Sequence, residues 1–239
     1  MTAAGAAPAQ TAPGRLIVAL DFPEPGQARS LADALGDLPV TLKIGLELIY
    51  AGGLDLVREL VEEGRSTFLD AKLLDIPNTV ERSAASAAAL GVTFLTVHGT
   101  DAKTLGAAVR GRGSSATRLL AITVLTSLDE ADLREQGIAA SAEEMVLRRA
   151  RLAAEAGFDG VVASPQEAAA IRAAMGDRLL IVTPGIRPAG AASADQARVA
   201  APADALRAGA DYLVVGRPIT AAADARAAAQ AILAEMATA

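Results

Sequence analysis

Short apolar runs alternate along the chain with longer segments of helical character. The apolar runs predict eight strands, at residues 16–20, 40–44, 67–72, 94–98, 119–126, 160–163, 180–183 and 212–216. The segments that follow them predict eight helices, at residues 27–35, 54–63, 79–90, 102–110, 143–156, 165–175, 202–208 and 221–236. Continuous apolar strands separated by helices are typical of a parallel sheet covered by helices. Eight such units without an internal linker predict an α/β fold, a (β/α)8 TIM barrel in a single domain.

Polar residues gather where these predicted strands end. Those at or just beyond a carboxyl end are Asp21, Lys43, Asp70, Lys72, His98, Thr126, Arg187 and Arg217. In a TIM barrel this rim holds the active site. The agreement across so many strands is a stronger indication of a functional site than any single motif.

Length and composition agree with this architecture. The chain has 239 residues, close to the ~250 usual for a TIM barrel, and its hydrophobic content of 52% is ample for a core. The barrel domain is expected at residues 15–239. Residues 1–14 are rich in Ala, Pro, Thr and Gly and lack the basic start and apolar middle of a signal peptide. They are therefore expected to form a disordered N-terminal tail.

Charge and residue counts narrow the function classes. The net charge of −6 and the pI near 4.9 argue against a nucleic-acid or membrane-surface partner, although a local cluster of Arg and Lys can still bind an anion. No apolar run approaches the ~18 residues of a membrane helix, and a cytoplasmic protein is expected. Without cysteine there is no disulfide framework or thiolate metal site. The single histidine, His98, is more often a structural residue than a base or ligand in such a position.

Asp70 and Lys72 end the strand expected at residues 67–72. Side chains alternate between the faces of a strand, so these two must project from the same side. Lys and Asp are seldom buried unless they are paired, so the pair is either a structural salt bridge or a reaction centre. Lysine occurs only as Lys43, Lys72 and Lys103, whereas arginine is plentiful. A retained lysine suggests that a compact, transferable proton is needed.

Two loops indicate a phosphate site. Gly216 and Arg217 follow the eighth strand, where barrels often bind phosphate through backbone amides and a short helix start. The guanidinium of Arg217 adds a bidentate cation. The loop after the seventh strand supplies Arg187, and Gln196 could close over a ligand there. The stretch 188–194 between them is expected to be a flexible lid.

The run Asp70-Ala71-Lys72-Leu73-Leu74-Asp75-Ile76-Pro77-Asn78-Thr79 is a highly specific motif. Shorter motifs accompany it in a fixed order: Ala19-Leu20-Asp21, Leu42-Lys43-Ile44-Gly45, Val97-His98, Val124-Leu125-Thr126-Ser127, Thr183-Pro184-Gly185-Ile186-Arg187, Asp195-Gln196 and Val215-Gly216-Arg217-Pro218-Ile219. In these residues, which run from about Leu16 to Thr220, the chain resembles the orotidine 5'-monophosphate decarboxylase family. One departure is Ala200-Ala201-Pro202, where the family commonly has Thr before Pro. It puts at most a helix cap in doubt.

The resemblance implies a cofactor-free and metal-free carboxy-lyase. Such an enzyme converts orotidine 5'-monophosphate to UMP and CO2, the last step of de novo UMP synthesis. The family implies a charged tetrad of Lys43, Asp70, Lys72 and Asp75 in a homodimer with shared sites, in which Asp75 enters the neighbouring subunit's site. Lys72 would stabilise the C6 carbanion and then protonate it, and Asp70 would face the departing carboxylate.

The resemblance also implies a set of substrate-binding residues. They are Asp21, Lys43, Ile76, Thr79, Thr126, Pro184, Arg187, Gln196, Gly216 and Arg217. Asp21 and Lys43 would contact ribose hydroxyls, and without the family they would be read as a salt bridge at the barrel rim. Thr126 would reach the pyrimidine ring, with Ser127 as the adjacent alternative.

Other interpretations stay open. A sister sugar-phosphate decarboxylase or hexulose-phosphate synthase would share Asp-x-Lys-x-x-Asp but would use Mg2+ and an enediolate. The residues 76–79 and the loop with Arg187 and Gln196 favour the nucleotide enzyme. A non-catalytic barrel that binds a phosphoribosyl ligand is a second alternative, which the tetrad disfavours. The charged residues at 143–156, including Arg149, indicate a solvated helix face with i,i+4 pairs.

Overall fold

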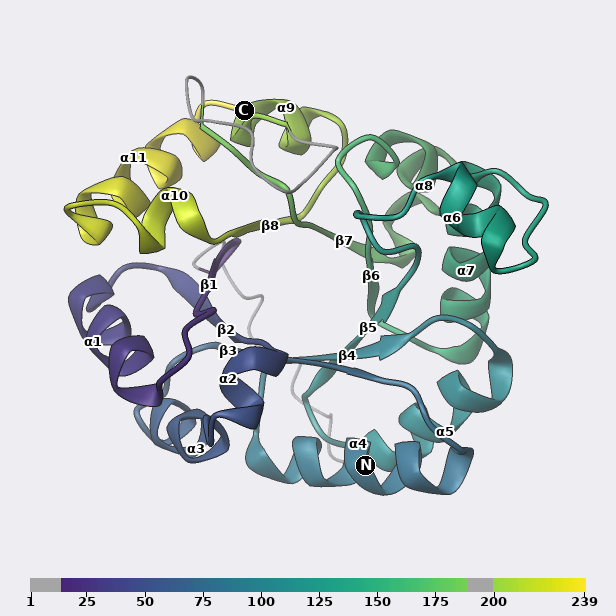
Figure 1. Cartoon of the computed structure of the whole chain (residues 1–239), viewed down its shortest axis with the longest axis horizontal. Coiled ribbons are helices and arrows are strands. Elements are labelled where there is room, and N and C mark those ends of the chain that lie inside the picture. The colour runs from purple at the N-terminus through teal and green to yellow at the C-terminus, as the bar shows by residue number, and fades with distance from the viewer. Residues whose placement is uncertain (1–13, 189–199) are drawn as a thin grey trace, which may run out of the picture.

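The structure is a computed structural model that describes residues 14–188 and 200–239. Eight parallel strands close into a barrel in chain order, with β1 also paired to β8 (Figure 1). The strands are β1 (Leu16–Ala19), β2 (Val40–Ile44), β3 (Thr67–Leu73), β4 (Phe94–His98), β5 (Arg118–Ile122), β6 (Gly160–Val162), β7 (Leu180–Thr183) and β8 (Tyr212–Val215). The predicted (β/α)8 TIM barrel is confirmed. The expected tail, apart from Gly14, lies outside the described residues.

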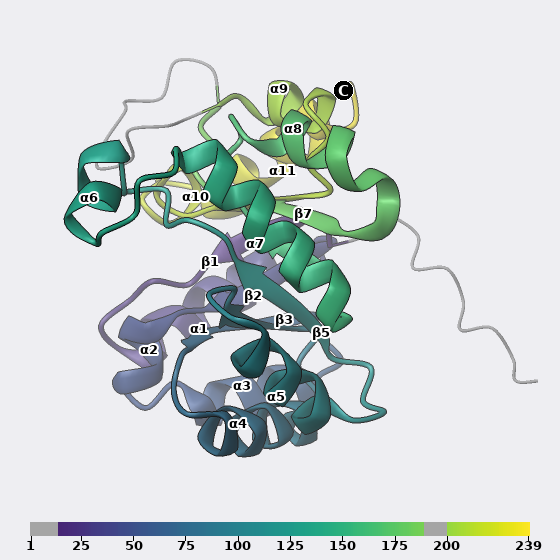
Figure 2. The same cartoon turned by 90° about the vertical axis from the view of Figure 1, so that its right-hand side faces the viewer.

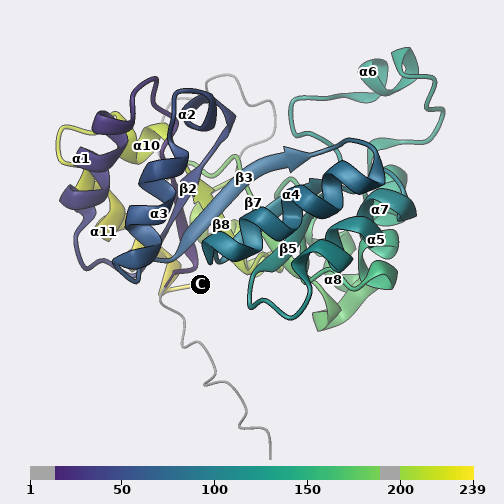
Figure 3. The ribbon, with the colours of Figure 1, turned by 90° about the horizontal axis from the view of Figure 1, so that it is seen from below.

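Helices surround the barrel and include all eight that the sequence predicts. They are α1 (Pro25–Leu35), α2 (Leu46–Tyr50), α3 (Leu54–Glu62), α4 (Pro77–Leu90), α5 (Ala102–Arg112), α6 (Glu130–Glu135), α7 (Ala142–Ala156), α8 (Ala168–Met175), α9 (Pro202–Arg207), α10 (Arg217–Thr220) and α11 (Ala225–Met236), with a 3-10 turn at Gly176–Arg178. The short helices α2, α6 and α10 and the 3-10 turn were not predicted. α6 stands out from the ring at the same end of the barrel as α2 (Figure 2 and Figure 3).

The largest difference from the predicted elements is at the fifth strand. The apolar run 119–126 predicts a strand through Thr126, but β5 ends at Ile122. Its partner β6 has three residues and pairs only with Leu120 to Ile122. Beyond Ile122 the backbone N–H of Thr123 still donates to the carbonyl of Val162, the last residue of β6, at 3.2 Å. The run then continues as a loop, which carries Leu125 and Thr126 into the site.

The strands are apolar throughout because both of their faces are buried. One set of side chains fills the barrel interior: Ile17, Ala19, Phe68, Phe94, Leu120, Val182 and Val214. Phe94 stacks edge-on against both Phe68 and Tyr212, at centroid distances of 5.8 and 5.1 Å. The alternate set packs outward against the helices. Burial on two faces is typical of a closed parallel barrel.

Carboxylates tie neighbouring strands together at the N-terminal end of the barrel. Asp211 Oδ2 accepts hydrogen bonds from Arg172 Nη2 at 2.7 Å and from the backbone N–H of Ile181 at 2.8 Å. Asp159 Oδ2 accepts in the same way from Arg112 Nη1 and from the backbone N–H of Leu119, each at 2.8 Å. Each carboxylate thereby joins a charged side chain to the beginning of a neighbouring strand.

The described parts of the chain, 14–188 and 200–239, contain neither a candidate membrane-spanning helix nor a candidate metal-binding cluster. No helix there is both long and apolar enough to cross a lipid bilayer. No three or more histidine, cysteine or carboxylate side chains are grouped there in a way that could hold a metal ion.

Candidate active site

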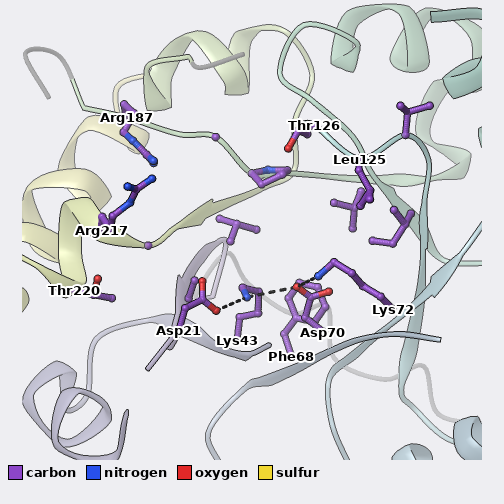
Figure 4. Close-up of a pocket in the computed structure, with 18 residues that line it drawn as sticks. Asp21, Lys43, Phe68, Asp70, Lys72, Leu125, Thr126, Arg187, Arg217 and Thr220 are labelled. Carbon is purple, nitrogen blue, oxygen red and sulfur yellow. Dashed lines mark hydrogen bonds and ion pairs between the residues drawn. The ribbon is translucent and has the colours of Figure 1, made fainter. Parts of the chain in front are cut away.

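A cavity of about 530 Å³ opens at the C-terminal end of the barrel. Its size is that of a small-molecule site. It is lined by Ala19, Asp21, Lys43, Phe68, Asp70, Lys72, Ile122, Val124, Leu125, Thr126, Val162, Pro184, Gly185, Arg187, Val214, Gly216, Arg217 and Thr220. Most of the site residues predicted from the sequence therefore lie around one cavity (Figure 4).

Four charged side chains form a row of alternating sign along one wall. Lys43 Nζ lies 3.0 Å from Asp21 Oδ1 and 3.4 Å from Asp70 Oδ2. Lys72 Nζ lies 2.7 Å from the same Asp70 oxygen. Lys43 and Asp70 are buried, at 7% and 8% exposure, whereas Lys72 and Asp21 are more open. The row thus has a more exposed charge at each end, Asp21 and Lys72, and a buried pair between them (Figure 4).

The two buried members hold each other in the charged form. Burial lowers the pKa of the Lys43 ammonium, but the charges of Asp70 and Asp21 outweigh it and leave that pKa above its usual value. Burial raises the pKa of Asp70, but Lys43, Lys72 and a hydrogen bond from Thr96 leave it below its usual value. A buried ammonium and a buried carboxylate therefore face the cavity at neutral pH.

The strand that carries Asp70 and Lys72 is irregular where they lie. The pairing of β3 with β4 shifts register between Leu69 and Leu73. Lys72 has a φ of +47° and is the only residue other than glycine with positive φ in the described part of the chain. Such a conformation costs about 1–3 kcal/mol and persists where surrounding structure holds it. The predicted contact of Asp70 with Lys72 is present, but on a bulged strand.

Two arginines lie across the cavity from this row. Arg217 begins α10 directly after Gly216, and the backbone N–H groups of Ile219 and Thr220 return to the Gly216 carbonyl. The side chains of Arg187 and Arg217 point toward one another (Figure 4). Arg187 also donates to its neighbouring Ile186 carbonyl at 2.9 Å. Paired guanidinium groups beside a helix start are suited to a phosphate dianion.

The wall between these two charged ends is mainly apolar. It consists of Ile122, Val124, Leu125 and Val162, with Thr126 at its edge. Thr126 lines the cavity, whereas the alternative residue Ser127 is exposed and does not. The sequence had not singled out Leu125, Thr220 or Phe68 as lining residues, because each is an ordinary residue of an apolar run or a short turn.

Three predicted site residues do not line the cavity of their own chain. Asp75, Ile76 and Thr79 are exposed on the segment from β3 to α4. Asp75 Oδ1 accepts a hydrogen bond from the backbone N–H of Ile76 at 2.6 Å. Only three members of the expected tetrad therefore meet within one chain. Gln196 and all but Pro188 of the lid expected at 188–194 lie outside the described residues.

His98 and Arg149 lie near the row of charges but do not line the cavity. His98 is half-buried at the end of β4 and does not line the cavity. Burial, followed by the charges of Arg149 and Lys72, lowers its pKa, so the imidazole is neutral at pH 7. The expected solvated face of residues 143–156 is wrong for Arg149, which turns inward and donates to the Thr123 carbonyl. Helix packing against the end of β5 decides this orientation.

Thr96 was missed by the sequence analysis, although a polar residue in the middle of a buried strand is a signal. Its hydroxyl bonds to both Asp70 and the Lys72 backbone.

The departure from the family pattern at Ala200-Ala201-Pro202 lies at the start of α9. Ala201 is the N-cap of α9 and makes no side-chain cap hydrogen bond.

A TIM barrel with an ionised row and paired arginines at its C-terminal mouth defines an enzyme class that acts on small phosphorylated substrates. The chain belongs to the Orotidine 5'-phosphate decarboxylase / HUMPS family, whose model matches residues 14–232.

Individual relatives resemble the chain over nearly its whole length. An orotidine 5'-phosphate decarboxylase of Methylobacterium sp. (strain 4-46) is 57% identical over 228 residues, covering 94% of this chain and 96% of the relative. An orotidine 5'-phosphate decarboxylase of Rhodopseudomonas palustris (strain HaA2) is 53% identical over 225 residues, covering 94% of this chain and 95% of the relative. The crystal structure of orotidine 5'-phosphate decarboxylase from Lactobacillus acidophilus superposes with a TM-score of 0.83 at 40% identity, covering 92% and 98%.

Proposed function

We propose that this chain decarboxylates orotidine 5'-monophosphate to UMP and CO2, the last step of de novo UMP synthesis, without a cofactor. Its family and its relatives of 53–57% identity support this activity. The single observation that carries the chemistry is the row from Asp21 to Lys72 beside a cavity with two arginines at its far side.

Lys72 is the catalytic acid in this proposal. When the bond between C6 and the carboxyl carbon breaks, CO2 leaves and the electron pair stays on C6. The ammonium beside C6 stabilises that charge and then gives it a proton, so a C6–H bond forms and Lys72 is left as a neutral amine. Solvent reprotonates it for the next turnover.

Asp70, which also pairs with Lys43, positions the Lys72 ammonium for this role. Asp70 Oδ2 lies 2.7 Å from Lys72 Nζ, so the ammonium is held in place before substrate arrives. Little reorganisation is then needed during the reaction. Asp70 also faces the leaving carboxylate, and two like charges 4 Å apart repel by about 4 kcal/mol at an effective dielectric near 20. We assign the larger effect to stabilisation of the carbanion.

The remaining lining residues bind the substrate. Asp21 and Lys43 contact the ribose hydroxyls, Thr126 contacts the pyrimidine, and Pro184 also contacts the substrate. Arg187, Arg217 and the backbone of Gly216 bind the phosphate, and Gln196, which lies outside the described residues, is assigned to the same end of the substrate. Phosphate binding remote from C6 helps to hold the ring against Lys72.

A second copy of the chain completes each site. Asp75, Ile76 and Thr79 reach the partner's cavity in this proposal, which agrees with their exposure and their absence from the lining of their own. Large apolar side chains on α2 and beside Asp75 are also exposed to solvent, among them Tyr50 at 87% and Ile76 at 67% exposure. A homodimer would bury them.

Mixing two inactive variants tests the shared site. Lys72→Ala and Asp75→Ala chains that exchange subunits form hybrid dimers with one intact site in two. Because half of the randomly paired dimers are hybrids, activity should recover to about a quarter of the wild type. Absence of any recovery after proven subunit exchange would count against shared sites.

We also propose that residues 15–239 form the catalytic unit and that it works in the cytoplasm. Substrate and product carry phosphate charges, so the enzyme must share a compartment with the reactions that make and use them.

The decisive experiment follows the absorbance of orotidine 5'-monophosphate with purified protein, with and without EDTA. Rapid loss that is unaffected by the chelator is expected. Slow or absent loss would contradict the proposal and point to sugar phosphates with Mg2+. If the chelator slows the absorbance loss, the decarboxylase activity would stand, but the proposal that it needs no cofactor would be contradicted.

A further inference from the structure

Thr96 lies between the two residues to which the chemistry is assigned, yet it does not line the cavity. Its side chain is fully buried in β4, at 0% exposure. Thr96 Oγ1 donates to Asp70 Oδ1 at 2.9 Å and accepts from the backbone N–H of Lys72, also at 2.9 Å. A hydroxyl has one proton to donate, and here an ionised carboxylate receives it.

The first consequence concerns the direction of the Asp70 carboxylate. A carboxylate turns easily about its last side-chain bond, and its two oxygens are otherwise equivalent. Thr96 occupies Oδ1, so Oδ2 is left for Lys72 at 2.7 Å and Lys43 at 3.4 Å. The hydroxyl thus decides which oxygen faces both ammonium groups.

The second consequence concerns the backbone of Lys72. The register shift of β3 against β4 takes Lys72 out of the regular ladder, at a φ of +47°. A buried backbone N–H requires a partner, and Thr96 Oγ1 supplies it. The same hydroxyl therefore supports the strained turn from which the Lys72 side chain leaves the strand.

We propose that Thr96 is a positioning residue for decarboxylation, whose one hydroxyl sets where the Lys72 ammonium stands by holding both the Asp70 carboxylate and the Lys72 backbone. The inference rests on the roles proposed above for Asp70 and Lys72. It predicts a loss of turnover without a loss of substrate affinity, because Thr96 touches neither the ribose nor the phosphate end of the cavity.

The chain offers a matched control in Thr67. Thr67 begins β3, is also fully buried, and its hydroxyl has no hydrogen-bond partner among the described residues. Replacing either threonine by valine exchanges a hydroxyl for a methyl group of similar shape. The two substitutions therefore differ in the hydrogen bonds that they remove.

The experiment compares kcat, KM for orotidine 5'-monophosphate and Kd for UMP in Thr96→Val, Thr96→Ser and Thr67→Val. Thr96→Val should lower kcat about 10- to 100-fold, the effect of misplacing a reacting group by ~1 Å, with KM and Kd within about threefold of the wild type. Thr96→Ser retains the hydroxyl and should recover kcat to within about threefold, and Thr67→Val should match the wild type. If Thr96→Val does not fold, the pair Thr96→Ser and Thr96→Ala isolates the hydroxyl in the same way.

Two results would overturn the inference: near-normal kcat in Thr96→Val, or equal impairment in Thr96→Ser and Thr96→Val. A crystal structure of Thr96→Val without substrate adds a readout that does not depend on activity. It should show the Asp70 carboxylate rotated or Lys72 relaxed to negative φ, and unchanged geometry would also overturn the inference. Wild-type protein that fails to decarboxylate the substrate would instead refute the proposed function.

Discussion

The two ends of this barrel use the same residue types for different purposes. At the N-terminal end, Asp159 and Asp211 each bind an arginine and a strand N–H through one oxygen. At the C-terminal end, Asp70 binds Lys43 and Lys72, and that row faces a cavity. Carboxylates tied to backbone donors stabilise a fold, whereas carboxylates paired with lysine ammonium groups beside a cavity are available for chemistry.

The two ends differ in the other partners that each charged side chain has. Arg172 donates to the carbonyls of Gly176 and Gly209 as well as to Asp211, so the network at the N-terminal end belongs to the backbone. Lys43 lies within salt-bridge distance only of Asp21 and Asp70 in the described part of the chain. The charges of the row at the C-terminal end therefore depend on one another for their partners.

The largest expected effect comes from the C-terminal end. Lys72→Ala should reduce kcat by about 10,000-fold, because it removes the group proposed both to donate the proton and to stabilise the carbanion. UMP affinity should stay within about tenfold of the wild type, since the ammonium acts mainly in the transition state. The exposed Lys103→Ala is the matched control. Near-normal turnover in Lys72→Ala would remove the basis for treating this end as catalytic.

A smaller loss is expected at the phosphate side of the same end. Arg217→Ala should lower kcat/KM for orotidine 5'-monophosphate about 10- to 100-fold, as expected for charge-assisted hydrogen bonds worth about 1.5–3 kcal/mol. Orotidine has no phosphate, so with it the variant and the wild type should be equal. The exposed Arg207→Ala should match the wild type with both substrates. An equal loss with orotidine would mean that Arg217 acts on something other than phosphate.

The N-terminal end should show the opposite behaviour. Asp211→Ala should lower the free energy of unfolding by about 1–3 kcal/mol, because it leaves the buried N–H of Ile181 without its acceptor and removes the carboxylate partner of the Arg172 guanidinium. Urea unfolding measures this change, and kcat of the folded variant should stay within about twofold. Asp177→Ala removes the fully exposed partner of Arg172 and should change stability little. A loss of kcat in folded Asp211→Ala would contradict a purely structural role for the N-terminal end.

The smallest effect is a pH dependence of stability at the C-terminal end. Burial opposes ionisation of Asp70, but Lys43 and Lys72 hold the pKa of the folded protein below the usual 3.8. Such a group contributes stability that is fully present well above pH 3.8 and is lost as pH falls through the lower folded pKa. The stability difference between the wild type and Asp70→Asn should therefore shrink in acid. Urea unfolding between neutral pH and pH 3 measures it, and a constant difference would contradict the proposed ionisation.

Most of the fold could be predicted from the sequence because both faces of each strand are buried. That burial makes the strands continuous apolar runs, and β2, β4 and β7 have the predicted bounds. The fifth strand was predicted too long, since an apolar loop that lines a cavity has the same composition as a strand. The helices α2 and α10 were missed because four or five residues are too few to show a helical period.

The order of apolar runs and polar residues along the chain was enough to predict the barrel, the rim that carries the site, and the spacing that lets Asp70 meet Lys72. These depend on alternation and order along the chain, which are local properties. Only the tertiary structure decided that Thr96 joins Asp70 to the Lys72 backbone, and that Asp75 turns away from the cavity of its own chain. The physical reason is that the neighbour of a strand residue depends on the register between β3 and β4, and a bulge there changes the register without leaving a pattern in either strand.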